Sequence, residues 1–379
     1  MSKKIWTIID TENGVYLENF EHKNEKIRIT KRRLYGGLQD GVDVIEVDNG
    51  KLSFTVCPTR GMGILNAKCG DLDLKWDSPA CGPVHPKFVR LAEPSGLGWL
   101  DGFSEWVVRC GLENNGSPDF NGNGAMTHSL HGKIANIPAH KVELCIDSET
   151  GEITLTGTVL ESRMFFKRLE LQVEYTTFAG TSEFLLKDKV TNLSAEPGEF
   201  VLLYHINTGN PLAAQGANIL VPYDVLVPRN SDAQAELSTW NICDPEKPGS
   251  NEVVYFIEPA TNESGNSGAI LLGKDQDRAL ALRFSKKQFP YFCVWKSRLG
   301  AGDGYVVGLE PCVNFPNATS FERSQGRTVK LAPKESRQFD IKFEIHLGKE
   351  DVASARKSIE SLQKQGTIEN QPRPNWGWG

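Results

Sequence analysis

Short runs in which apolar and polar residues alternate dominate this chain of 379 residues. Residues 42–48 alternate in this way, the pair Asn49 and Gly50 then signals a tight turn, and residues 52–57 resume the alternation. Alternation with period two places apolar side chains on one face of a β-strand, and an Asn-Gly pair between two such runs is typical of a hairpin. Further runs of this kind lie at residues 141–146, 152–159, 169–175, 184–190, 200–205, 268–272, 280–284, 291–295 and 339–345.

Many short strands separated by Gly, Asn and Pro predict antiparallel sheets packed as a sandwich, and hence an all-β fold. A convincing helix is expected only at residues 351–362, where apolar residues share one face. Two long stretches, 77–124 and 222–249, break the strand rhythm, and such excursions are often functional. We therefore predict one domain over residues 1–379, with its core at 25–348 and a C-terminal helix and tail at 350–379.

Charge and composition exclude several classes of protein. A formal net charge of -6 offers no basic face for the phosphates of nucleic acid. No run approaches the roughly 20 apolar residues of a membrane helix, and the first residues lack the features of a signal peptide. We expect a cytoplasmic protein with no nucleic acid and no membrane as partner, and leave its oligomeric state open, a homodimer included. The 8 cysteines are scattered without a C-x-x-C pair, which predicts free thiols.

Three histidines are candidates for chemistry. His128 and His131 lie three residues apart in a flexible segment, so they form either a metal pair or one functional and one structural histidine. His205 ends a strand-like run and is followed by Asn207, whose amide could orient an imidazole or bind hydroxyl groups. The alternative for His205 is a core histidine bonded to the backbone.

A carboxylate and an arginine complete the candidate set. Glu310 ends an apolar strand just before Pro311, and because burial of an unpaired carboxylate is costly it must have a partner or face a cleft. Asn314 follows shortly after it. Arg60 leaves a strand for a turn, where its guanidinium would clamp a ligand or pair with an acid. The aromatic residues Trp76, Trp99, Phe103 and Trp106 would form either an apolar platform under a sugar ring or part of the core.

Three segments match one known family in the same order along the chain. They are Ser-Leu-His-Gly at 129–132, Tyr-His-Ile-Asn at 204–207, and Gly-Leu-Glu-Pro-Cys-Val-Asn-Phe-Pro-Asn at 308–317. Together they resemble the aldose 1-epimerase (galactose mutarotase) family over most of residues 25–348. Residues 58–63, 75–79 and 315–323 suggest a divergent, largely uncharacterised branch. The resemblance implies a large antiparallel β-supersandwich with the sugar on a concave sheet face.

Two departures from the family pattern concern the sugar rather than the acid–base groups. The double glycine usual after the first histidine is Gly132 and Lys133 here, and the stretch after His205 lacks the common aromatic residues. The identity of the sugar therefore does not follow from the resemblance.

The implied activity is the interconversion of the anomers of a free aldose without a cofactor, by acid–base ring opening. Glu310 would be the base, since a carboxyl with a pKa of about 4.3 is ionised at neutral pH. His205 would be the acid at the ring oxygen, and His131 would polarise that oxygen or hold a neighbouring hydroxyl. The residues expected to bind the sugar are Arg60, Asn207, Asp101, His128, Asn314 and Trp99.

Two other functions fit the same residues. The first is a metal-dependent sugar lyase, hydrolase or epimerase that places a divalent ion among the histidines and Glu310. The second is a non-catalytic carbohydrate-binding protein, in which Glu310 would be dispensable.

Overall fold

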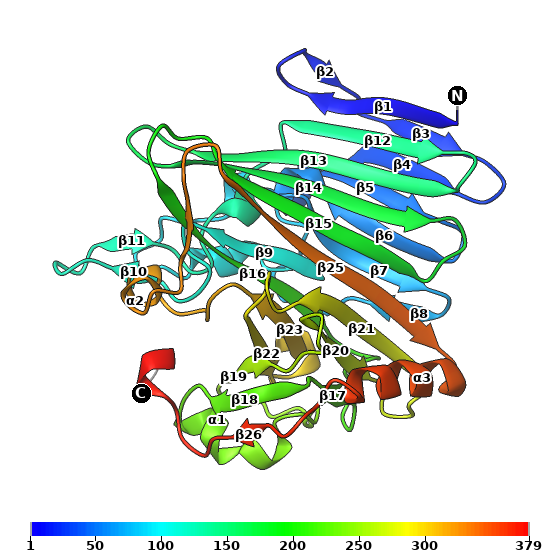
Figure 1. The fold of residues 1–379 in the computed structure, drawn as a ribbon. Coiled ribbons are helices and arrows are strands. Elements are labelled where there is room, and N and C mark those ends of the chain that lie inside the picture. The colour runs from blue at the N-terminus through cyan, green and yellow to red at the C-terminus, as the bar shows by residue number, and fades with distance from the viewer. Residues whose placement is uncertain (1, 378–379) are drawn as a thin grey trace.

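The computed structural model describes residues 2–377, which form two large, mainly antiparallel sheets that lie face to face (Figure 1). The predicted all-β sandwich is confirmed. The strands of the first sheet are β1 (Lys3–Asp10), β2 (Val15–Tyr16), β12 (Lys141–Asp147), β13 (Glu152–Ser162), β14 (Arg168–Phe178), β15 (Glu183–Asn192), β17 (Asn218–Leu220), β20 (Asn266–Leu272), β21 (Arg278–Ser285) and β25 (Ser336–Leu347). Their order in space is β17-β20-β21-β25-β15-β14-β13-β12-β1-β2.

The second sheet carries the candidate site. Its strands are β3 (Phe20–Lys23), β4 (Arg28–Arg33), β5 (Asp43–Asp48), β6 (Leu52–Cys57), β7 (Gly63–Cys69), β8 (Leu72–Leu74), β9 (Val107–Leu112), β16 (Gly198–Thr208), β18 (Tyr223–Pro228), β19 (Val253–Pro259), β22 (Tyr291–Ser297), β23 (Val306–Cys312), β24 (Val329–Leu331) and β26 (Thr367–Ile368). The main order is β26-β18-β19-β22-β23-β16-β9-β7-β6-β5-β4-β3, with β24 beside β16 and β8 beside β7. The hairpin expected around Asn49 and Gly50 is confirmed as β5 and β6.

Helices are short and few in the described part of the chain. The α-helices are α1 (Ser231–Ala235), α2 (Thr319–Ser324) and α3 (Lys349–Glu360), and a small ribbon pairs β10 (Asp119–Phe120) with β11 (Met126–His128). Single turns of 3-10 helix are η1 (Gly37–Gln39), η2 (Pro58–Arg60), η3 (Pro86–Phe88), η4 (Gly98–Gly102), η5 (Ile134–Asn136), η6 (Leu237–Thr239), η7 (Ala301–Asp303) and η8 (Pro374–Trp376). The expected C-terminal helix is confirmed as α3, which packs Val352, Ala355 and Ile359 on residues of β20 and β21.

Alternation along the strands divides the buried side chains between two cores. In β16, Leu202, Tyr204 and Ile206 belong to the core between the sheets. Leu203 belongs to a second buried cluster on the other face of the same sheet, and His205 follows it at the same period. The loops of the 77–124 stretch and the C-terminal segment cover this outer face, because the second cluster contains Trp99 and Trp376. One strand therefore delivers its histidine to a covered outer face of the sheet.

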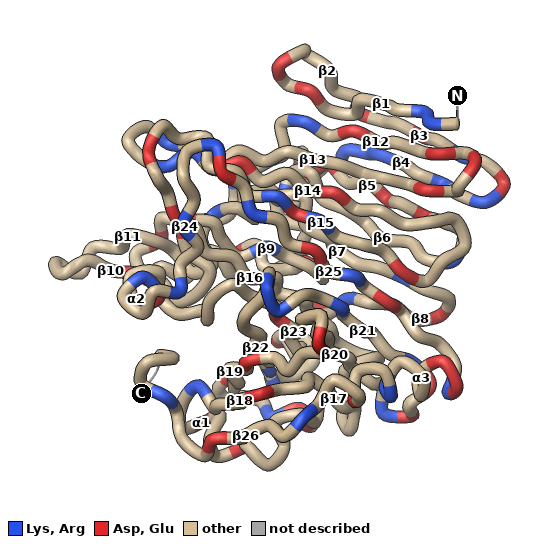
Figure 2. The backbone as a smooth tube through the Cα atoms, viewed as in Figure 1, with Lys and Arg blue, Asp and Glu red and all other residues tan. Residues whose placement is uncertain are grey.

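The surface and the cysteines agree with the sequence-based expectations about charge and thiols. Figure 2 shows acidic and basic residues interspersed along the strands rather than gathered on a single-sign face. All 8 cysteines are free. Over residues 2–377, no helix is long and apolar enough to span a membrane.

Candidate functional site

His205 and Glu310 lie beside each other on neighbouring strands. His205 is in β16, Glu310 is in β23, and the two strands pair in antiparallel fashion. Nε2 of His205 is 3.1 Å from Oε1 of Glu310, and the two residues are only 4% and 2% exposed. Oε1 makes no hydrogen bond of good geometry with any described residue, so the two groups approach closely without a fully formed bond. The structure thus brings the two main catalytic candidates into proton-transfer range.

Gly308 provides the space for this approach. It lies two residues before Glu310 on β23, on the same face of the strand. A Cβ atom at position 308 would lie 2.5 Å from Oε1 of Glu310, 3.2 Å from Cε3 of Trp295 and 3.3 Å from Cε1 of His205. Only glycine leaves the carboxyl, the imidazole and the indole in their present positions.

Asn207 sets the tautomer of His205. Its Nδ2 donates to the backbone carbonyls of Glu105 (3.0 Å) and His205 (3.3 Å), which fixes the orientation of the amide. Oδ1 of Asn207 therefore faces Nδ1 of His205 and accepts its hydrogen. Nε2 is left as a lone pair directed at Glu310. Asn207 is 0% exposed, so the expectation that it binds the sugar is corrected: it orients the imidazole from behind.

His131 approaches the pair from a loop. Its ring centroid is 5.6 Å from that of His205, with the planes nearly perpendicular. Nδ1 of His131 lies 2.8 Å from the backbone carbonyl of Asn115, which can only accept, so Nδ1 carries the hydrogen and Nε2 is an acceptor. His131 has φ 56, a left-handed conformation uncommon outside glycine, and such residues often mark functional sites.

Burial shifts the pKa of all three groups towards their neutral forms. It lowers the pKa of His205 to about 3, with the neighbouring His131 adding to the effect and the bond to Asn207 opposing it. Burial also lowers the pKa of His131 to about 4, although the carbonyl of Asn115 and the charge of Glu252 act against this. Burial and the charge of Glu252 raise the pKa of Glu310 well above its ordinary value. These shifts favour a protonated carboxyl and neutral imidazoles, the reverse of the charges expected from reference pKa values.

A cavity of about 440 Å³ lies beside this group, and none of the three residues lines it directly. Trp76, Phe103 and Trp295 line it, and the rings of Phe103 and Trp295 pack against His205 at 5.1 and 5.0 Å. Glu252 lines it as well, with its side chain 47% exposed. The cavity therefore has aromatic walls and a half-exposed carboxylate at its edge, and two of its aromatic residues pack against His205.

Glu252 is held in an ionised state at this edge. Its Oε2 accepts from Nε1 of Trp295 (2.6 Å) and its Oε1 from Nη2 of Arg229 (2.8 Å). Burial alone would raise the pKa of Glu252, but these two donors outweigh it and the pKa is lowered. The site thus combines one carboxyl with a raised pKa and one with a lowered pKa, and such a separation is typical of acid–base sites.

Arg60 and Trp99 do not line the cavity, and both are buried beneath the candidate site. Arg60 is 0% exposed and binds the carboxylate of Glu105, Oδ1 of Asn136 (2.8 Å) and a backbone carbonyl. The expectation that it clamps a sugar is therefore corrected: it fixes Glu105, whose carbonyl holds Asn207. Trp99 is also 0% exposed, and its ring packs against His131 at 4.6 Å.

Three of the four aromatic residues proposed as a platform contact one another. Phe103 packs against Trp76 and against Trp99 in tilted ring contacts, each with a centroid separation of 4.8 Å. Trp106 points to the other face of the sheet and belongs to the core between the sheets. Asp101 turns away from the cavity, because its carboxylate pairs with Arg90 at 2.8 Å.

His128 and Asn314 lie apart from the cavity. His128, on β11, is 3.8 Å from the carboxylate of Asp119 and lines a different hollow. The structure therefore separates it from His131. In residues 2–377, no group of three or more His, Cys, Asp and Glu side chains could hold a metal ion. Asn314 is fully buried and exchanges two hydrogen bonds of 2.9 Å with Asn115, the residue that holds His131.

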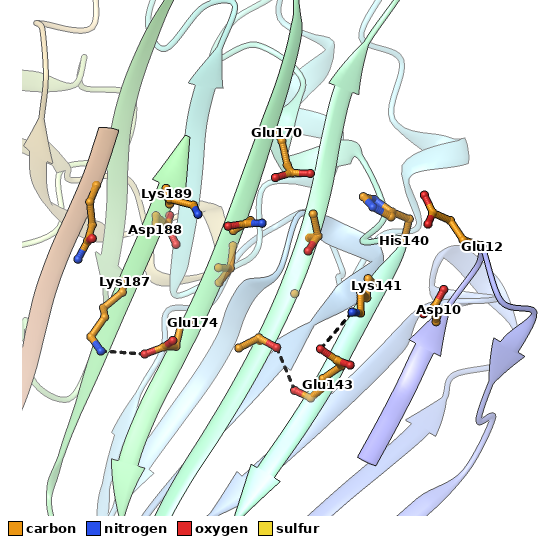
Figure 3. Close-up of a pocket in the computed structure, with 16 residues that line it drawn as sticks. Asp10, Glu12, His140, Lys141, Glu143, Glu170, Glu174, Lys187, Asp188 and Lys189 are labelled. Atoms are coloured by element: carbon orange, nitrogen blue, oxygen red, sulfur yellow. Dashed lines mark hydrogen bonds and ion pairs between the residues drawn. The ribbon is translucent and has the colours of Figure 1, made fainter. Parts of the chain in front are cut away.

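A second hollow lies on the outer face of the first sheet (Figure 3). It has a volume of about 550 Å³ and is lined by charged residues of β12 to β15. Its Lys and Glu side chains pair with one another, as Lys187 does with Glu174 at 2.8 Å and Lys141 with Glu143 at 3.3 Å. It has no aromatic wall and no paired acid and imidazole, so we place the site at the smaller cavity.

Three residues at or near the cavity were not predicted from the sequence. Trp295 and Glu252 line the cavity, and Asn115 orients His131. For Trp295 a signal existed, because in the run 291–295 it shares a face with Cys293 rather than with Phe292 and Val294. Glu252 lies just past the polar stretch 222–249, and nothing local in the sequence distinguishes it from a surface glutamate.

The two face-to-face sheets give the chain a galactose mutarotase-like fold. A family model described as "Domain of unknown function (DUF4432)" matches residues 39–345, and the chain belongs to this family. No curated protein matches the chain in sequence.

Solved structures are similar over 81–98% of the chain. A "putative aldose 1-epimerase" from Klebsiella pneumoniae is 31% identical with a TM-score of 0.93, and the match covers 98% of this chain and 99% of that one. A galactose mutarotase-like protein from Clostridium acetobutylicum is 15% identical with a TM-score of 0.57, covering 86% of this chain and 100% of that one. A "putative aldose 1-epimerase" from Escherichia coli K12 is 14% identical with a TM-score of 0.52, covering 81% and 100%. The last two show the fold alone.

Proposed function

We propose that this protein interconverts the anomers of a free aldose by acid–base ring opening, without a cofactor. The observation that carries the proposal is the buried pair of His205 and Glu310, 3.1 Å apart, which holds one transferable proton. Mutarotation removes a proton from the anomeric hydroxyl and delivers one to the ring oxygen, so it needs one acceptor and one donor. The similarity to the "putative aldose 1-epimerase" from Klebsiella pneumoniae, which is 31% identical, supports the same chemistry.

The pKa shifts favour a neutral pair, and this supports the following first step. The carboxyl of Glu310 gives its proton to the ring oxygen O5 while Nε2 of His205 takes the proton of the anomeric hydroxyl. The C1–O5 bond breaks and the carbonyl forms at C1. After rotation about C1–C2, O5 attacks the other face of the carbonyl, Glu310 recovers its proton from O5, and His205 returns its proton to O1. Both residues end in their starting states, and no other reactant is needed.

These roles exchange the acid and the base that the resemblance implied. An ionised Glu310 beside a protonated His205 contains the same number of protons as the neutral pair. The hydroxyl groups of a bound sugar would stabilise that charged arrangement, so the opposite assignment belongs to the same proposal. His131 accepts a hydrogen bond from a neighbouring hydroxyl, because its free Nε2 carries no hydrogen to donate to the ring oxygen.

The cavity supports a sugar as the ligand. Its volume of about 440 Å³ lies within the usual range for small-molecule sites. The rings of Trp76, Phe103 and Trp295 would cover the apolar C–H face of a pyranose. The carboxylate of Glu252 would accept hydrogen bonds from its hydroxyl groups.

Access to the pair requires a side-chain movement. His205 and Glu310 are almost completely buried, and Phe103 and Trp295 pack over the imidazole. We propose that the sugar displaces one of these rings as it binds. A bound sugar that took the place of this ring would keep water out of the reacting centre and strengthen its electrostatic interactions.

Glu310→Gln tests the proposal, because glutamine keeps the shape of the side chain and removes its proton chemistry. Polarimetry on freshly dissolved α-aldoses should show a fall in rate on the order of 10²–10⁴-fold. Phe165→Ala is the matched control, since Phe165 is 92% exposed at the β13–β14 turn. Wild-type rates in Glu310→Gln would refute the assignment of Glu310. Tight sugar binding without turnover by the wild-type protein would instead indicate a carbohydrate-binding protein.

A further inference from the structure

The C-terminal segment at residues 373–377 packs against the chain that follows Glu310. Trp376, in η8, is 5% exposed, and its ring lies 4.7 Å from that of Phe315. Its backbone carbonyl accepts a hydrogen bond of 2.9 Å from Nδ2 of Asn317. In Figure 1 the end of the chain lies on the side of the molecule that carries β10, β11 and α2. This segment thus contacts a loop that begins three residues past Glu310.

A buried ion pair fixes this contact. Glu322 is 0% exposed, and its two oxygens accept from Nε and Nη2 of Arg327, both at 2.7 Å. Nη1 of Arg327 donates to the backbone carbonyl of Asn375 at 2.7 Å, and Nδ2 of Asn317 donates to Glu322 at 2.7 Å. One ion pair therefore ties the C-terminal segment and the loop together, and charge-assisted bonds of this kind are the strongest class in proteins.

The same loop holds the segment that orients His131. Asn314 exchanges two hydrogen bonds with Asn115, and the carbonyl of Asn115 accepts from Nδ1 of His131. The backbone N–H of His131 donates to the carbonyl of Gly116 at 2.9 Å. Gly116 packs so tightly on Pro316 that a Cβ atom would lie 2.0 Å from its carbonyl carbon. The contacts run without interruption from Trp376 to His131.

We propose that Trp376 and Asn317 are positioning residues that hold His131 in place through the loop 313–317 and Asn115. His131 depends on such support, because its left-handed backbone conformation is unfavourable for a residue with a side chain. The part of His131 in the chemistry rests on the proposed function, whereas the mechanical link to Trp376 does not. The ring of Trp376 does not line the cavity, so it acts only through its neighbours.

Trp376→Ala in the full-length chain tests this link. Amide exchange at His131 should become about tenfold faster, because its hydrogen bond to Gly116 opens more often. In ¹⁵N-histidine spectra, assigned with His131→Gln, the Nδ1–H form of His131 should give way to a mixture of tautomers. The mutarotation rate should fall on the order of 10²-fold with little change in KM, since a displacement of about 1 Å has effects of this size.

Two further variants separate positioning from general stability. Trp376→Phe keeps an aromatic ring on Phe315 and should restore the His131 signals and exchange. Trp6→Ala is the matched control: Trp6 packs on Phe20 at 5.7 Å, in β1 at the far edge of the first sheet, and its loss should leave His131 unchanged. If Trp376→Ala does not fold, Asn317→Ser removes the two bonds of the amide with a smaller change in volume.

The results distinguish the two proposals. Wild-type exchange and a single Nδ1–H tautomer of His131 in folded Trp376→Ala and Asn317→Ser would overturn the positioning role, whatever the activity. Changes at His131 that also appear in Trp6→Ala would overturn it too. A wild-type protein without mutarotase activity would refute the proposed function, while the exchange and tautomer measurements would still test the link from Trp376 to His131.

Discussion

Replacing Gly308 with alanine would place a methyl group among the side chains assigned to proton transfer. The added carbon would lie 2.5 Å from Oε1 of Glu310, far inside normal contact, and 3.3 Å from Cε1 of His205, slightly inside it. The carboxyl is the flexible end of its side chain, so it would rotate away from the imidazole. Position 308 needs no left-handed backbone, so the change acts through this crowding.

The magnitudes follow from the same contacts. Overpacking a core position costs about 1–3 kcal/mol, and the loss of glycine flexibility in the unfolded chain returns about 0.4–1 kcal/mol. We expect a net loss of about 1–2 kcal/mol in the free energy of unfolding, measured by urea denaturation, and a folded protein. A displacement of Glu310 by about 1 Å would lower the mutarotation rate on the order of 10²-fold in polarimetry.

A matched glycine shows whether crowding is the cause. Gly122 has open space where a Cβ atom would lie and no left-handed backbone, so Gly122→Ala should change neither stability nor rate. A Gly308→Ala protein that turns over sugar at the wild-type rate would refute the claim that His205 and Glu310 act as a close pair. Equal losses in both variants would remove the steric explanation.

Three further predictions concern charge and hydrogen bonding. The folded pKa of His131, about 4, is below its unfolded value of about 6.5, so its contribution to stability is present above pH 6.5 and is lost as pH falls towards 4. Between pH 7 and 4.5, the free energy of unfolding of the wild-type protein should therefore fall about 2 kcal/mol more than that of His131→Gln. Equal falls in the two proteins would contradict a neutral His131 in the folded state. Asn207→Leu removes the acceptor that fixes the tautomer of His205 and should lower kcat on the order of 10²–10⁴-fold. An unchanged kcat would show that the tautomer of His205 does not affect the rate. Asp188→Asn leaves the fully buried Arg109 without its carboxylate and should cost about 3–5 kcal/mol in urea denaturation, and a loss below about 1 kcal/mol would contradict the importance of this ion pair.

The strands were predictable because each is a local pattern. The run at 52–57 is β6, and the run at 141–146 is β12 shortened by one residue. The order of strands in space was not predictable in the same way. The neighbours of β16 are β9 and β23, about a hundred residues away on either side, and no pattern within a strand records its partner.

For the site, the sequence identified the chemical groups but not what surrounds them. Glu310 and His205 were recognisable as polar residues that end apolar runs. Arg60 and Asn207 were assigned to the sugar because their types suit hydroxyl groups, yet both are fully buried and bind other protein groups. Both residues are buried because loops of the 77–124 stretch fold over the sheet. The residues next to Arg60 and Asn207 in the sequence do not show that these distant loops will cover them.

Burial beneath these loops also influences the protonation state of Glu310. Three buried thiols, those of Cys110, Cys293 and Cys312, share the sheet face around Glu310, and their own pKa values are raised by burial. Thiols of this kind are neutral and give a carboxylate little solvation, so they favour the protonated form of Glu310. The ionised Glu252 at the cavity edge acts in the same direction. A reference pKa predicts an ionised Glu310, whereas the folded chain removes its water and places a negative charge nearby. The buried surroundings of Glu310 therefore favour the proton that the proposed reaction needs. A substitution that admitted water beside Glu310 would lower its pKa and favour loss of this proton.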